Sequence, residues 1–241
     1  MFEELKPHIV ELRKRLVICV VALLVVFIAT FSFWKEILDF VLMPLKEVLP
    51  EQSNVVFTQL AEAFFTAIKV SFFASLFISA PIIFWQFWLF VAPGLYDNEK
   101  KYVLPFVFFA SIMFFLGAAF CYFFVIPVAF KFLITFGGEV ATAMPKIDEY
   151  VGFFTKLIIA FGISFELPVI TFFLAKIGLI TNKSLSEFFR YAIVVIFIFA
   201  AIMTPPDVLS QFMLAVPLIA LYALSIFIAK CVNPYKEVNV D

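Results

Sequence analysis

Long stretches without a charged residue constrain this chain more than any other feature of its sequence. The two longest, Val70–Tyr96 and Tyr102–Phe130, hold 27 and 29 consecutive residues without Asp, Glu, Lys or Arg. A helix needs about 20 apolar residues to cross the hydrocarbon core of a bilayer, and it satisfies its own backbone hydrogen bonds there. These stretches therefore predict helices that span a membrane.

The composition agrees with this prediction and excludes several other classes of protein. Of the 241 residues, 65% are hydrophobic and only 15% are charged, too few to cover the surface of a soluble domain. The formal net charge of −1 offers no basic patch for nucleic acid. The three cysteines have no metal-ligand spacing, and we expect them to be free thiols. The N-terminus lacks the pattern of a cleaved signal peptide, so the first span is expected to remain as an anchor.

The sequence predicts an all-α polytopic fold that forms one domain over residues 1–241. An amphipathic segment at residues 1–15 is expected to precede the first span, and a short interfacial helix after that span is expected to stop before Pro44. Pro81 and Pro127 are expected to bend the second and third spans. The six transmembrane helices are predicted at about residues 16–34, 65–92, 102–130, 150–176, 191–204 and 208–229.

The last two helices are predicted to be short. The uncharged part of the fifth, Tyr191–Met203, has 13 residues and would be only about 20 Å long as a helix. Pro217 interrupts the sixth. We therefore expect a hairpin that sits low in the membrane or thins the bilayer beside it.

Lysine and arginine are distributed unequally between the two sides of the predicted spans. Eleven lie on the side of the termini and of the loop at residues 92–101, and four lie on the opposite side. Lys69 and Lys156 fall inside predicted spans, and snorkelling of its long side chain accounts for Lys69. Positive charge favours the cytoplasmic side, so both termini and the 92–101 loop are predicted to be cytoplasmic.

Glu166 is the first candidate for a functional residue, because it lies near the centre of the fourth predicted span. A carboxylate at that depth is costly unless it is paired, hydrated or protonated, so a function is the leading hypothesis. The structural alternative is a neutral acid that hydrogen-bonds to another helix through Gln86 or Gln211. A proton-carrying role in a secondary transporter is the functional alternative, although the chain shows no inverted repeat.

Two further carboxylates are predicted on the cytoplasmic side. Glu99 lies just before the third span, where it can accept the fork of an arginine side chain. By charge pattern alone, Glu99 is better explained as a helix-start acid, with Lys100 and Lys101 as anchors. Glu11, in the amphipathic N-terminal segment, would alone be interpreted as part of a solvated helix face, but it should lie on the same side as Glu99.

Motifs of enzymes are missing from the sequence. The only histidine is His8, outside the predicted spans, and there is no HExxH, GxSxG or glycine-rich phosphate loop. No metal or cofactor is predicted, and the chain is not expected to be an enzyme. Asp207 follows two prolines and is expected to cap the sixth helix.

The order of these motifs along the chain resembles the TatC family, the polytopic core subunits of twin-arginine protein translocases. The resemblance covers nearly the whole length of the chain. It includes the predicted six helices, with both ends of the chain on the cytoplasmic side. The matching segments are His8–Leu16 (HIVELRKRL), Ser79–Pro81, Phe90–Tyr96 (FVAPGLY) with Glu99, Phe161–Pro168 (FGISFELP), and Thr204–Asp207 (TPPD) with Ser210 and Gln211. Lys100 and Lys101 depart from the family by standing where arginines are common.

The resemblance implies a function for the cytoplasmic side. It implies that Glu99 and Glu11 meet the two arginines of a signal peptide on a folded cargo protein, with Phe90 near the apolar part of that signal. Leu12 and Arg13 belong to the same segment as Glu11 and are included in the expected binding site.

The resemblance also implies a glove-shaped concave bundle in the bacterial inner membrane, with Glu166 on its concave face and Gln86 and Gln211 as further intramembrane polar residues. Single-span partners, TatB-like and TatA-like, are implied near the fifth helix and the turn Thr204, Pro205, Pro206 and Asp207. The expected complex also contains further copies of this chain. The function implied is that of a receptor and scaffold for protein translocation.

Overall fold

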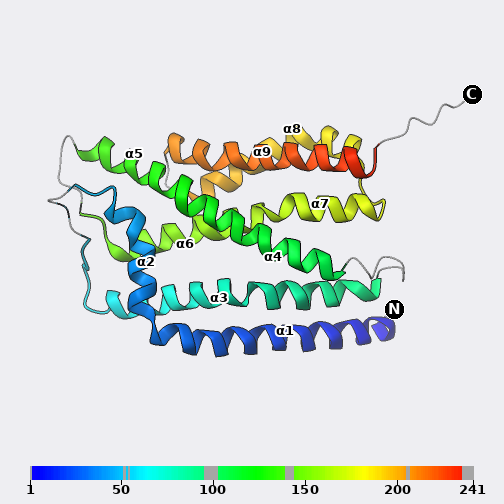
Figure 1. The fold of residues 1–241 in the computed structure, drawn as a ribbon, viewed down its shortest axis with the longest axis horizontal. Coiled ribbons are helices and arrows are strands. Elements are labelled where there is room, and N and C mark those ends of the chain that lie inside the picture. Colours follow the sequence, from blue (N-terminus) through cyan, green and yellow to red (C-terminus); the bar gives the residue numbers. More distant parts are fainter. Residues whose placement is uncertain are drawn as a thin grey trace, which may run out of the picture. The chain divides into compact units, whose positions relative to one another are not determined.

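A computed structural model describes residues 2–50, 53, 55–94, 103–138, 144–204 and 207–234 of the chain. These residues form helices joined by short connections (Figure 1). Within the described residues, six helical segments are long and apolar enough to span a membrane: His8–Ser32, Glu62–Val91, Val103–Phe136, Ile147–Lys176, Asn182–Met203 and Val208–Val232. The prediction of an all-α fold with six spans is therefore confirmed.

The chain divides into two compact units, which are described separately. The first contains residues 1–111 and 142–152, and the second contains residues 112–141 and 153–241. The expectation of one domain over the whole chain stays a prediction.

In the first unit, α1 (Phe2–Ser32) and α3 (Glu62–Val91) lie antiparallel and side by side (Figure 1). Two hydrogen bonds fix their register. Thr30 Oγ1 donates to Ser71 O at 2.9 Å, and Arg15 Nη1 donates to Gln86 Oε1 at 3.2 Å. The two contacts are 15 residues apart on both helices, which is about 22 Å of helix. This register therefore places residue 11 of α1 level with residue 90 of α3.

The N-terminal amphipathic segment and the first span are a single helix, α1, and not the two predicted elements. The basic residues at positions 13–15 end the apolar run but not the helix, because lysine and arginine are good helix formers. Charge therefore marked where the apolar span begins and gave no information about where the helix begins.

Helix α2 (Trp34–Lys46) crosses the end of the α1–α3 pair (Figure 1). It contains Pro44, so the prediction that this helix stops before Pro44 is wrong. A proline removes one backbone hydrogen bond, but the next turn is completed by Glu47 N donating to Met43 O at 3.1 Å. Burial of Leu45 and a 2.7 Å hydrogen bond from Tyr150 Oη to Val41 O hold α2 in place.

The third span is longer than its uncharged run. Helix α4 (Val103–Phe120), a π-helical turn (Cys121–Val125) and α5 (Ile126–Gly138) follow one another without a gap, so the helical path continues eight residues beyond the predicted end at residue 130. In the π-helical turn, Ile126 N donates to Cys121 O. The turn comes just before Pro127, which cannot donate, and such bulges are a recognised cause of helix bending.

The fourth span is broken near its centre. Helix α6 (Ile147–Ser164) and α7 (Glu166–Lys176) are separated by Phe165. Pro168 explains the position of the break, because its nitrogen has no hydrogen for Ser164 O and its ring crowds that carbonyl. Helix α7 ends in a glycine turn, in which Gly178 has φ 79° and Leu179 N donates to Leu174 O at 2.9 Å.

Helix α8 (Asn182–Met203) is longer than predicted. It begins nine residues before Tyr191 and has 22 residues, or about 33 Å of helix, enough to cross a bilayer. Thr181 caps its N-terminus in a capping box with Ser184, which starts the helix within polar sequence. The predicted start of the fifth helix is therefore wrong, although its uncharged part, Tyr191–Met203, still has 13 residues. Its partner α9 (Val208–Val232) has 25 residues and is not short.

Candidate functional site

The predicted binding residue Glu11 belongs to a polar cluster between α1 and α3. Arg15 Nη2 donates to Glu11 Oε1 at 2.9 Å, one helical turn away, and Arg15 Nη1 donates to Gln86 Oε1. The side chains of Arg15 and Glu11 are 23% and 31% exposed, and Gln86 is 9% exposed. The three residues therefore form a partly buried chain of charge-assisted hydrogen bonds, which are stronger than neutral ones.

Two aromatic residues, Trp88 and Phe90, follow Gln86 at the end of α3. Phe90 is half-buried and is four residues after Gln86, so the two share a face of the helix. Because the register places residue 11 level with residue 90, the carboxylate of Glu11 and the ring of Phe90 belong to the same level of the α1–α3 pair. Trp88 is buried and stacks on Phe106 with ring centroids 5.1 Å apart, which anchors this end of α3.

Of the remaining residues of the predicted binding site, Leu12 and Arg13 are described by the structure and Glu99 is not. Leu12 and Arg13 are exposed on α1, Leu12 beside the face that carries Glu11 and Arg15, and Arg13 on the opposite side of the helix. Glu99 lies outside the described residues, as do its neighbours Lys100 and Lys101. The structure thus brings Glu11 and Phe90 to one level, and the role of Glu99 stays a prediction.

Glu166 begins α7 directly after the break in the fourth span. Its side chain is 7% exposed, and its Oε1 atom is buried without a hydrogen-bond partner among the described residues. The predicted alternative was a hydrogen bond to Gln86 or Gln211. Gln211, in the same unit as Glu166, uses its Nε2 atom to donate to Phe197 O at 3.1 Å and makes no hydrogen bond to Glu166. Gln86 belongs to the first unit, where its amide oxygen accepts from Arg15, and a hydrogen bond between Gln86 and Glu166 stays a prediction.

Two glycines decide how closely helices pack beside Glu166 in the second unit. A Cβ atom on Gly117 of α4 would lie 2.6 Å from Phe161 O, and one on Gly162 of α6 would lie 2.7 Å from the ring of Phe114. The helices therefore approach at a distance that only glycine permits, as is common between membrane helices. This helix contact is connected to the break between α6 and α7, because Phe161 O, which faces Gly117, also accepts a hydrogen bond from Phe165 N at 3.0 Å.

The turn between α8 and α9 has the cap that the sequence predicted. Asp207 Oδ1 accepts a hydrogen bond from Ser210 N at 2.7 Å at the start of α9. Thr204 is buried, and its hydroxyl donates to Ala200 O at 2.9 Å. Pro205 and Pro206 lie outside the described residues.

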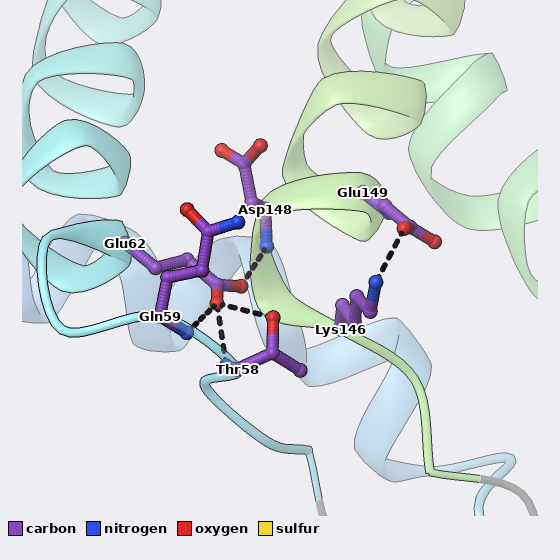
Figure 2. Close-up of polar contacts among 6 residues, drawn as sticks. All are labelled: Thr58, Gln59, Glu62, Lys146, Asp148 and Glu149. Carbon is purple, nitrogen blue, oxygen red and sulfur yellow. Dashed lines mark hydrogen bonds and ion pairs between the residues drawn. The ribbon is translucent and has the colours of Figure 1, made fainter.

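A further carboxylate with several partners in the described part of the first unit is Glu62, for which sequence analysis had no role (Figure 2). Its Oε2 atom accepts from Thr58 N at 2.6 Å and from Gln59 N at 3.1 Å. Its Oε1 atom accepts from Asp148 N at 3.2 Å. Glu62 therefore holds the loop before α3 and caps the N-terminus of α6 with one buried side chain.

Ion pairs surround this contact. Lys69 pairs with Asp148. Lys146 Nζ lies 3.3 Å from Glu149 Oε1 (Figure 2). Lys69 therefore has a specific partner, which snorkelling alone did not anticipate. The available signal was an acidic pair at the start of α6, where acids favour the positive end of the helix dipole.

Within the described residues, no group of three His, Cys, Asp or Glu side chains could hold a metal ion. The polar clusters that are present consist of carboxylates paired with guanidinium, ammonium or backbone N–H groups. Such an arrangement can bind a cationic or hydrogen-bonding peptide segment.

Comparisons with known proteins point in one direction. Residues 7–217 match the model of the family described as Sec-independent protein translocase protein (TatC). The TatC protein of Campylobacter jejuni is 59% identical over 97% of this chain and 96% of its own length. The TatC protein of Escherichia coli strain K12 is 39% identical over 95% of this chain and 88% of its own. A crystal structure of the twin arginine translocase receptor TatC covers 93% of this chain and 99% of its own, with a TM-score of 0.85 and 38% identity.

Proposed function

The chain belongs to the TatC family of Sec-independent protein translocase proteins, and we propose that it is the signal-peptide receptor and assembly scaffold of a twin-arginine translocase. The observation that carries the proposal is the Glu11 carboxylate, held by Arg15 and level with Phe90. A carboxylate at the same level as an aromatic ring matches a signal that presents arginine next to apolar residues.

One arginine of the signal pairs with Glu11, and the second pairs with Glu99. Arginine suits both positions because its planar fork matches a carboxylate, whereas lysine is a point charge. Removing one partner of a desolvated charge pair costs about 2–5 kcal/mol. Because the Glu11 side chain is 31% exposed, we expect the lower end of that range, about 2 kcal/mol, or roughly a thirty-fold loss of affinity.

The protein is a multi-pass membrane protein, and we place it in the bacterial cytoplasmic membrane with both termini inside. The excess of lysine and arginine on the side of the termini supports this orientation. In this orientation Glu11, Phe90 and the 92–101 loop face the cytoplasm, where a folded cargo protein presents its signal.

We propose that TatB-like and TatA-like single-span subunits and further copies of this chain assemble on the second unit. Helix α8 supports this role because it exposes apolar side chains along much of its length: Val194, Val195, Ile198 and Ile202. The family assignment also favours a receptor over a secondary transporter that carries protons on Glu166.

The test is site-specific crosslinking from Glu11 and from the 92–101 loop to a twin-arginine precursor, with a twin-lysine precursor as the control. We expect crosslinks from both positions that the twin-lysine precursor does not form. A second measurement is the affinity of a twin-arginine peptide for the purified Glu11→Gln and Glu99→Gln proteins. Unchanged affinity in both variants would refute the arginine site.

A further inference from the structure

Gln86 is a buried amide on a helix whose neighbouring residues are almost all apolar. Burying an amide is costly unless it is hydrogen-bonded, so such a residue needs a partner. The partner is Arg15 on the facing helix, 71 residues away in the sequence. The contact is therefore a feature of the α1–α3 register and not of either helix alone.

The guanidinium of Arg15 connects this amide to the Glu11 carboxylate. Its Nη1 atom is held by Gln86 and its Nη2 atom is held by Glu11. A guanidinium is planar and rigid, so fixing one arm also fixes the direction of the other. Removing the amide would release Arg15 from α3 and leave Glu11 attached only to a mobile side chain of its own helix.

Arg15 engages only one of the two carboxylate oxygens. The contact is with Oε1, and Glu11 Oε2 makes no hydrogen bond to any described residue. A carboxylate accepts at both oxygens, so Oε2 remains able to accept from an arginine of another chain while Arg15 stays in place. A carboxylate whose rotamer is already ordered loses less entropy on binding than a mobile one.

Given the proposed function, on which this inference rests, we infer that Gln86 and Arg15 are positioning residues for signal recognition. Gln86 anchors Arg15, and Arg15 holds the Glu11 carboxylate with Oε2 presented to an arginine of the signal peptide. Neither residue needs to touch the signal.

The inference is tested by the affinity of a fluorescent twin-arginine peptide for the purified full-length protein in detergent. Replacing Gln86 by Leu should weaken binding about two- to twelve-fold, the range expected for ordering one long side chain. Gln86→Glu retains an acceptor for Arg15 Nη1 and should bind at least as tightly as the wild type. In a Glu11→Gln background, Gln86→Leu should have no further effect, because the two residues act through one contact.

Thr30→Val is the matched control. It removes the other hydrogen bond that joins α1 and α3, to Ser71 O, with little change in side-chain shape. If Gln86 merely holds the two helices together, Thr30→Val should weaken peptide binding as much as Gln86→Leu does. We expect Thr30→Val to bind within two-fold of the wild type.

Three results would overturn the inference. Equal effects of Gln86→Leu in the wild-type and Glu11→Gln backgrounds would show that Gln86 acts independently of Glu11. Tighter binding by Gln86→Leu would show that Arg15 competes with the signal. Weaker binding by Glu11→Gln but not by Gln86→Leu would reject the positioning role and leave the arginine site intact. Unchanged binding by Glu11→Gln would remove Glu11 from that site, and the site as a whole is refuted if Glu99→Gln also binds unchanged.

Discussion

Replacing Gly117 by Ala should destabilise the protein, because the close approach of α4 to α6 leaves no room for a methyl group. The new Cβ would lie 2.6 Å from Phe161 O and 2.8 Å from Phe165 Cγ. Against an optimal separation of about 3.5 Å, the helices would have to move by up to ~0.9 Å. The nearest obstacle is a backbone oxygen that accepts the hydrogen bond of Phe165 N, so it cannot rotate away as a side chain can.

Overpacking of this kind costs about 1–3 kcal/mol. Replacing glycine by alanine in a helix also stabilises the folded protein by about 0.5–1 kcal/mol. A control is therefore needed in which alanine brings this stabilisation but no clash. Gly152 of α6 provides it, because a Cβ there meets nothing within 4 Å. Gly162→Ala is an intermediate case, since its clash is with the ring of Phe114, which can shift.

The assay is thermal unfolding of the purified variants in one detergent. The difference between Gly117→Ala and Gly152→Ala isolates the clash and should be about 1–3 kcal/mol, or about 2–12 °C in melting temperature for a chain of this size. Gly162→Ala should fall between them. If Gly117→Ala melts at or above the temperature of Gly152→Ala, the argument from close packing is refuted.

Three further predictions concern single side chains. Thr181→Ala should remove the capping box of α8, cost about 1 kcal/mol and increase amide hydrogen exchange at residues 182–185; unchanged exchange would contradict the role of the cap. Glu62→Gln replaces one of the two accepting oxygens of the side chain by a donor. This variant should therefore have a lower melting temperature and faster hydrogen exchange at the Asp148 amide. Normal protection of that amide would show that Glu62 does not cap α6. For Glu166, whose Oε1 atom is buried without a partner in the described structure, Gln should retain more protein export than Leu; equal loss in both variants would indicate a required charge.

The number and approximate position of the spans could be predicted because hydropathy is a local property of the sequence. Helix ends were predicted less well. The apolar run of α8 begins at Tyr191, but the helix begins at Asn182, where Thr181 and Ser184 supply a cap. Hydropathy reports where lipid surrounds a helix, whereas hydrogen bonds decide where the helix itself begins and ends.

Part of the local structure was also predictable, because Asp207 was correctly expected to cap α9. The resemblance implied Glu11 and Phe90 as binding residues, and that role stays a prediction. The partners of these side chains were not identified. Gln86 was expected as an intramembrane polar residue, and the structure shows that it accepts a hydrogen bond from Arg15, a basic residue that had been interpreted as a topology signal.

The sequence by itself determined the class of protein, its six spans and its family, because these depend on local composition and on motifs that can be compared one by one. Only the tertiary structure decided which polar residues meet. Arg15 reaches Gln86 across 71 residues, and Glu62 reaches the Asp148 amide across 86. Such pairs depend on the register of packed helices. Shape complementarity over many small contacts sets this register, and no single stretch of sequence encodes it.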